Sequence, residues 1–93
     1  MLTALLLVIT EKGSETKVLR LLETIEAVEE VYSVCGTYDI VVKIKTQNID
    51  ELNKIITSHM VRSNDVRSTS TMIILPEKPI LNTLPKEVPT IAR

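Results

Sequence analysis

The sequence predicts a small α+β domain whose elements run in the order βαββαβ. Three observations predict this order: an apolar run over 2–10, two segments with apolar residues at three- and four-residue spacing, and β-branched runs over 31–46 and 66–75. Right-handed crossovers place both helices on one face of the sheet. We therefore expect a ferredoxin-like fold, a four-stranded antiparallel sheet with two helices on one face, which forms a dimer through the sheets.

The first strand and first helix follow from the opening of the chain. Residues 2–10 are almost continuously apolar, which favours a central strand covered on both faces. Ser14 is a candidate helix cap, and Val18, Leu22 and Ile25 share one helical face. This predicts a helix over about 14–28.

The next two strands meet at a corner of sequence Gly36-Thr37-Tyr38-Asp39. We expect strands over 31–35 and 38–46, joined as a hairpin in which Gly36 supplies backbone freedom and Asp39 can bond local amides. In the second of these strands, Ile40, Val42 and Ile44 share one face, opposite Val41, Lys43 and Lys45. The lysines are expected as solvated edge or interface charges.

The second helix is predicted from a capping box, with Asn48 as cap and Glu51 at the third helical position. It should end near Arg62. Its apolar stripe contains Ile49, Leu52, Ile55, Ile56 and Met60.

The last strand is expected over 66–75, after a turn at 63–65. It should place Thr69 and Thr71 on one face. Pro76 ends it, and all four prolines lie at or beyond that position, so we divide the chain into a domain over 1–75 and an extended arm over 76–93. The arm either docks its apolar residues on a neighbouring subunit or is disordered.

The composition of the chain limits the classes of function that it can have. The net charge is −1 and the basic residues are dispersed, which argues against direct binding of nucleic acid or an anionic membrane. The single Cys35 cannot form an internal disulfide, which is typical of a cytoplasmic protein, and no metal or cofactor motif is present. With no Phe or Trp to fill a small core, we expect self-association to bury more apolar surface.

Two stretches together resemble a known family: Val34 to Asp39 leading into Ile40-Val41-Val42, and Val66 to Ile74 after a capped helix. They look like the effector-binding (RAM) domain of the Lrp/AsnC transcription regulators, over residues 2–75. The resemblance implies dimers that pair through their sheets, assembly to higher oligomers such as octamers, and an amino acid bound between dimers. Because residue 2 already starts the first strand, we expect a stand-alone module without a helix-turn-helix segment.

Two positions depart from the family pattern. Cys35 stands where the family often has threonine, and Ser63-Asn64-Asp65 replaces a more apolar turn. Both departures leave the polarity of the pocket and the end of the second helix open.

The candidate ligand-binding residues are Gly36, Thr37, Tyr38, Asp39, Thr69 and Thr71. Asp39 is a candidate for the ammonium group of an amino acid, or else only shapes its turn. Gly36 and Thr37 offer amides for a carboxylate, although Gly36 could serve the turn alone. The threonine hydroxyls could complete the pocket or simply fill a strand. Tyr38 is expected in packing or at an interface, and His59 as a structural residue.

We therefore predict a non-enzymatic, amino-acid-sensing oligomerisation module that acts on full-length regulators of its family indirectly and needs no cofactor. Two alternatives stay open. One is a small dimeric ferredoxin-like enzyme of the monooxygenase-like group, and the other is a purely structural partner with no small ligand.

Overall fold

The computed structural model describes residues 1–75, and the expected arm over 76–93 with its docking lies outside them. The elements are β1 (Leu2–Thr10), α1 (Glu15–Glu23), β2 (Val28–Ser33), β3 (Ile40–Thr46), α2 (Ile49–Ile55), a π-helical continuation η1 (Ile56–Val61) and β4 (Val66–Ile74). The predicted βαββαβ order is confirmed.

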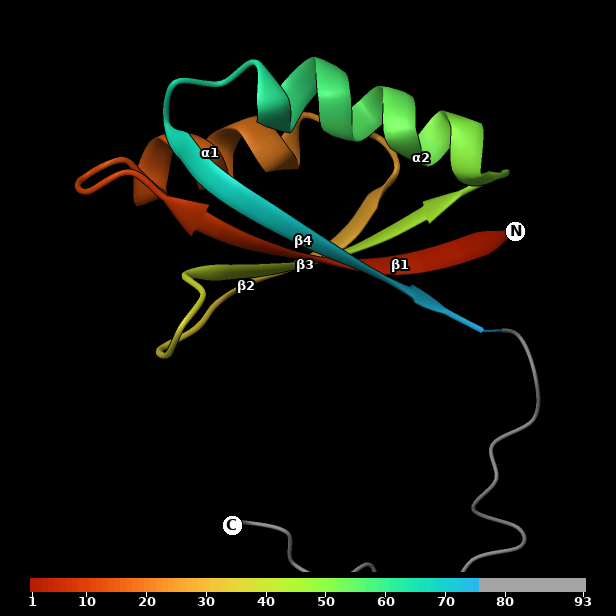
Figure 1. Cartoon of the computed structure of the whole chain (residues 1–93), viewed down its shortest axis with the longest axis horizontal. Coiled ribbons are helices and arrows are strands. Elements are labelled where there is room, and N and C mark those ends of the chain that lie inside the picture. Colours follow the sequence, from red (N-terminus) through yellow and green to blue (C-terminus); the bar gives the residue numbers. More distant parts are fainter. Residues whose placement is uncertain (76–93) are drawn as a thin grey trace, which may run out of the picture.

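The four strands form one antiparallel sheet in the order β2-β3-β1-β4. Both helices cover the same face of this sheet (Figure 1). β1 lies between β3 and β4, with Val8 opposite Ile40 on one side and opposite Thr69 on the other. The ferredoxin-like prediction is therefore confirmed for the single chain.

The hydrophobic core lies between the sheet and the helices. β1 and β3 each contribute alternate residues, and the helices contribute their apolar stripes; the core side chains include Ala4, Leu6, Val8, Ile40, Val42, Ile44, Val18, Leu22, Leu52 and Met60, all exposed by 2% or less. Alternation follows from the pleat of a strand, so the predicted shared face of Ile40, Val42 and Ile44 is confirmed.

β1 is central in the sheet but fully covered on only one face. Its residues alternate between buried and half-buried, and Leu5, Leu7 and Ile9 turn away from the helices. The expectation that both faces are covered therefore does not hold within residues 1–75.

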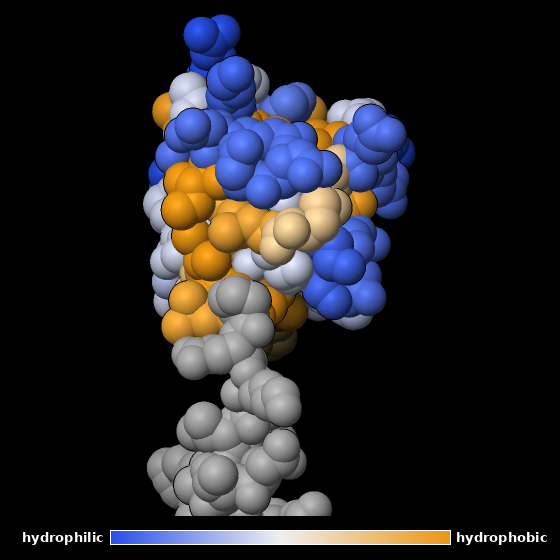
Figure 2. Space-filling view, turned by 90° about the vertical axis from the view of Figure 1, so that its right-hand side faces the viewer, coloured by the Kyte–Doolittle hydropathy of each residue, from blue (hydrophilic) through white to orange (hydrophobic). Residues whose placement is uncertain are grey.

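The face opposite the helices carries apolar side chains from neighbouring strands. The pairing places Leu5 beside Met72 and Leu7 beside Val41, on the side of the sheet that faces away from the core. Met72 and Ile74 are 48% and 46% exposed. Figure 2 shows hydrophobic surface gathered below the polar helix layer, at the end of the domain where β4 ends. This open face is a surface that a second copy could cover.

The first helix is shorter than the predicted 14–28. α1 ends at Glu23, and Ile25 is buried in the turn that follows rather than on the helix. Ser14 occupies the cap position without a capping bond, because its hydroxyl donates to Asp65 Oδ1 at 2.9 Å. A tertiary partner thus competes with the local cap that the sequence indicates.

β2 and β3 pair as the predicted hairpin, but the connection between them is longer than expected. β2 ends at Ser33 and β3 starts at Ile40, so residues 34–39 all belong to the connection. Gly36 does not use a positive φ angle; among the described residues only Gly13 does, at 82°. The freedom assigned to Gly36 is therefore needed at Gly13 instead, where the chain turns from β1 towards α1.

The second helical segment starts as predicted. The Glu51 amide donates to Asn48 Oδ1 at 2.9 Å, while the Glu51 carboxylate accepts from the Gln47 amide at 2.7 Å. The segment continues to Val61, but its second half is π-helical. Ile49 is 50% exposed, so it does not belong to the buried stripe.

We expect Leu6→Ala to lower the free energy of unfolding by about 2–5 kcal/mol, because it leaves a cavity under both helices. Ile49→Ala removes a similar side chain from an exposed position and should change it by less than about 1 kcal/mol. Urea unfolding followed by circular dichroism measures both. Equal losses in the two variants would contradict the assigned core.

Candidate functional site

Asp39 is held in place by its own backbone at the end of the β2–β3 connection. Its amide donates to the Val8 carbonyl at 2.9 Å, and its carbonyl accepts from the Val34 amide at 2.9 Å. The residue is therefore tied both to β1 and to the other end of its own connection.

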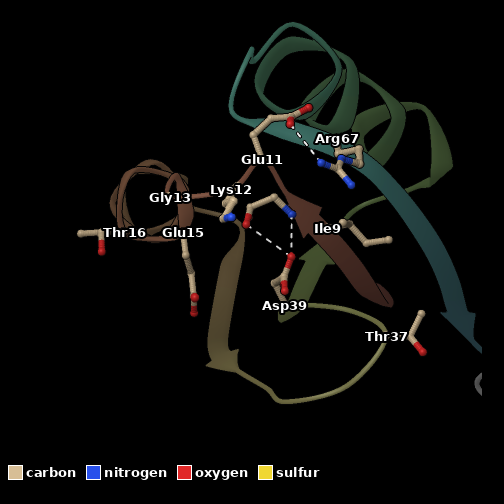
Figure 3. Close-up of a pocket in the computed structure, with 10 residues that line it drawn as sticks. Ile9, Glu11, Lys12, Gly13, Glu15, Thr16, Thr37, Asp39 and Arg67 are labelled. Atoms are coloured by element: carbon tan, nitrogen blue, oxygen red, sulfur yellow. Dashed lines mark hydrogen bonds and ion pairs between the residues drawn. The ribbon is translucent and has the colours of Figure 1, made fainter.

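The Asp39 carboxylate bridges to the end of β1. Its Oδ2 accepts from the Thr10 amide at 2.9 Å and from the Thr10 hydroxyl at 3.3 Å (Figure 3). The β1–β4 pairing changes register between Ile9 and Thr10, and the β1–β3 pairing ends at Val8. The carboxylate thus accepts hydrogen bonds from β1 just beyond the point where the pairing of β1 with β3 ends. Within residues 1–75, Asp39 Oδ1 has no hydrogen-bond partner, so one oxygen anchors the residue and the other is available.

A cavity of about 580 Å³ opens beside this carboxylate. It lies between the end of β1, the loop to α1, the first turn of α1, the start of β4 and the 34–39 connection. Among residues 1–75, five charged side chains line it: Glu11, Lys12, Glu15, Asp39 and Arg67. Arg67 Nη2 lies 3.3 Å from Glu11 Oε1. The site therefore offers both signs of charge within one hollow.

The structure brings together only part of the expected site. Thr37 and Asp39 line the cavity, whereas Gly36 and Tyr38 belong to the same connection without lining it. Thr69 lines a second hollow of about 210 Å³ beside η1, which shares Arg67 with the cavity beside Asp39, and Thr71 is exposed. β1 separates the two groups, because Val8 contacts Asp39 through its carbonyl and is paired with Thr69 on its other side.

Several residues of the cavity were not expected from the sequence: Thr10, Glu11, Lys12, Glu15 and Arg67. The signal that could have found Arg67 is topological. Antiparallel pairing of the first and last strands places the start of β4 beside the end of β1, where Glu11 offers an opposite charge.

The other polar residues singled out in the sequence make local contacts. His59 Nδ1 lies 3.1 Å from the Ile55 carbonyl, a contact within its own helical segment that fits the structural role expected for it. Lys43 and Lys45 lie 3.8 Å and 3.3 Å from the Glu29 carboxylate.

Tyr32 donates to Glu30 at 2.7 Å, and this bond, together with the charge of Glu30, raises the pKa of the exposed tyrosine. It lies on β2, outside the cavity beside Asp39.

Residues 1–75 contain no group of three or more His, Cys, Asp or Glu side chains arranged to hold a metal ion. In the same part of the chain, no helix is long and apolar enough to cross a membrane.

Comparison with known proteins gives a family match over most of the chain. The model of the Lrp/AsnC ligand binding domain matches residues 3–82. The HTH-type transcriptional regulator FL11 of Pyrococcus furiosus is 40% identical over 73 residues, which cover 77% of this chain and 47% of that regulator.

A homocitrate synthase of Saccharolobus solfataricus is 43% identical over 60 residues, which cover 64% of this chain and 13% of that enzyme. This chain thus spans less than half of either curated relative. A solved hypothetical protein of Pyrococcus horikoshii is 36% identical with a TM-score of 0.77, and the match covers 83% of this chain and 93% of that one.

Replacing Asp39 separates its anchoring role from its charge. Asp39→Ala removes the acceptor of two Thr10 hydrogen bonds and should destabilise the domain by about 1–3 kcal/mol. Asp39→Asn keeps an acceptor oxygen and should lose clearly less. Thermal unfolding of the two variants measures the difference, and a loss no greater for alanine than for asparagine would show that the Thr10 contacts contribute nothing.

Proposed function

Because this chain belongs to the Lrp/AsnC ligand-binding domain family, we propose that it binds a free amino acid and couples binding to the assembly of several copies. The observation that carries this proposal is the Asp39 carboxylate, which is anchored through Oδ2 and presents Oδ1 beside a cavity of about 580 Å³. A carboxylate fixed in this way is a preorganised partner for an α-ammonium group.

The cavity also supplies partners for the other end of an amino acid. Lys12 is a cation on its lining, Arg67 is a second cation there that is paired with Glu11, and the amide of Thr37 is a further candidate for the α-carboxylate. A zwitterion needs both signs of charge at short range. The mixed lining around Asp39 supports that chemistry better than a single-sign patch would.

Assembly is proposed to proceed through the open face of the sheet. Leu5, Leu7 and Met72 form neighbouring positions there and gain burial if a second copy packs face to face. Dimers then assemble further, to the octamer that the resemblance to the Lrp/AsnC regulators implies. In this proposal Thr69 and Thr71 reach the ligand of a neighbouring dimer rather than that of their own chain.

The relatives support a sensing role over a catalytic one. The matching segment makes up 47% of a transcriptional regulator and 13% of an enzyme, so one domain accompanies two different activities. A sensor that is shared between unlike proteins explains this distribution. We propose that this chain acts on regulators indirectly, by assembling with their ligand-binding domains.

Ligand binding should appear as thermal stabilisation. With one amino acid at a hundred times its dissociation constant, linkage adds about 2.7 kcal/mol to the stability of the folded state. We expect at least one of the twenty amino acids to raise the melting temperature of the wild-type chain, and Asp39→Asn to abolish that response. A wild-type chain that no amino acid stabilises would favour the purely structural alternative.

A charge on the open sheet face should prevent assembly without unfolding the domain. Leu7→Glu places a carboxylate in the proposed contact and should reduce the mass measured by light scattering, because an interface does not bury an unpaired charge. Ile49→Glu, on the exposed side of α2, is the control and should keep the wild-type mass. Unchanged mass in Leu7→Glu would place the interface elsewhere.

A further inference from the structure

The loop between β1 and α1 forms most of the cavity beside Asp39. Within residues 1–75, seven of the ten residues that line this cavity lie in the short stretch 9–16. Figure 3 shows this stretch running from the end of β1 into the first turn of α1, beside Asp39. The shape of the cavity therefore depends on how residues 11–14 are held.

Side-chain packing contributes little to the position of this loop. Lys12 and Gly13 are exposed, and a Cβ atom added at Gly13 would meet nothing beyond its chain neighbours within 4 Å. Gly13 has a φ angle of 82°, and a glycine is free to adopt many other conformations. The loop therefore depends on its hydrogen bonds for a defined position.

Asp65 supplies two of these hydrogen bonds. Its carbonyl oxygen accepts from the Glu11 amide at 2.8 Å, and its Oδ1 accepts from the Ser14 hydroxyl at 2.9 Å. The Ser14 amide donates to the Glu11 carbonyl at 2.9 Å, which joins the two ends of the loop. Asp65 thus binds the loop at both its first and its last residue.

The turn that carries Asp65 is held by other contacts than the loop. The Ser63 amide donates to the Met60 carbonyl at 3.2 Å, and the Ser63 hydroxyl oxygen accepts from the Asp65 amide at 3.1 Å. Met60 is 1% exposed, so the turn starts from a residue of the core. Asp65 is therefore a fixed point for the exposed loop, although it does not itself line the cavity.

We propose that Asp65 is a positioning residue for amino-acid binding: through Ser14, its carboxylate holds the β1–α1 loop in the conformation that forms the cavity. This inference rests on the proposed function, because it assumes that an amino acid binds beside Asp39. A loop that is ordered before binding loses less conformational entropy when the amino acid binds. The polar turn at 63–65, which departs from the more apolar turn of the Lrp/AsnC pattern, thereby raises affinity without contacting the amino acid.

The test removes the side-chain bond and leaves the backbone bond of Asp65 in place. Asp65→Ala and Ser14→Ala should each weaken binding by about three- to tenfold, because part of the binding free energy then orders the loop. Asp65→Asn keeps an acceptor for the Ser14 hydroxyl and should bind within about twofold of wild type. Titration calorimetry on the full chain measures these affinities, with whichever of the twenty L-amino acids raises the wild-type melting temperature most.

Two further variants distinguish positioning from a general loss of stability. The double variant Ser14→Ala/Asp65→Ala should bind no more weakly than either single variant, because both changes remove the same hydrogen bond. Thr24→Val is the matched control: the Thr24 hydroxyl donates to the Leu21 carbonyl at 2.6 Å at the other end of α1, and its loss should leave the affinity unchanged. Urea unfolding of each variant checks that the fold is retained.

Amide exchange of the chain without amino acid tests the role of Asp65 separately from binding. Residues 11–14 should exchange faster in Asp65→Ala and Ser14→Ala than in wild type, Asp65→Asn or Thr24→Val. Unchanged exchange, unchanged affinity, or an additive loss of affinity in the double variant would overturn the positioning role and leave amino-acid binding intact. A wild-type chain that binds none of the twenty amino acids would overturn the proposed function instead.

Discussion

The antiparallel pairing of β1 with β3 is the constraint on which the rest of the domain depends. It places Ala4, Leu6 and Val8 against Ile44, Val42 and Ile40 under the helices, and so forms the centre of the core. Where this pairing ends, at Val8 and Ile40, the next residue of the connection is Asp39. Its carboxylate binds Thr10 because no strand partner reaches that amide. The same pairing therefore builds the core and positions the candidate ligand contact.

The sheet has two faces with different roles. The helices cover one face, and the other keeps Leu5, Leu7 and Met72 only partly covered in a single chain. A domain of this size buries only about 60 to 65% of its unfolded surface, so in the proposed assembly burial of this face would add to the stability of the folded state. Ligand binding and assembly are thus linked in the proposed mechanism: the cavity supplies the anchored carboxylate, and neighbouring copies supply Thr69 and Thr71.

The sequence predicts the periodic features of this fold well and its tertiary contacts poorly. Alternation over Ile40 to Ile44 and the Asn48 cap are local patterns, and both are confirmed. Ser14 makes no capping hydrogen bond, because its hydroxyl donates instead to Asp65, 51 residues away in the sequence. Thr69 could be placed on a strand but not on the far side of β1 from Asp39, because that depends on strand order. For the same reason the contact between Arg67 and Glu11 was not anticipated.

Hydrogen exchange followed by mass spectrometry, with and without the amino acid that stabilises the chain, tests the central claim most directly. If the ligand sits on Asp39 beside the end of β1, peptides that contain Thr10 and Asp39 should exchange more slowly when it is bound. Peptides around Ala27 and Gln47, which line a separate hollow that also includes Met1, should not change. Protection confined to Ala27 and Gln47, with none at Thr10 or Asp39, would contradict the account.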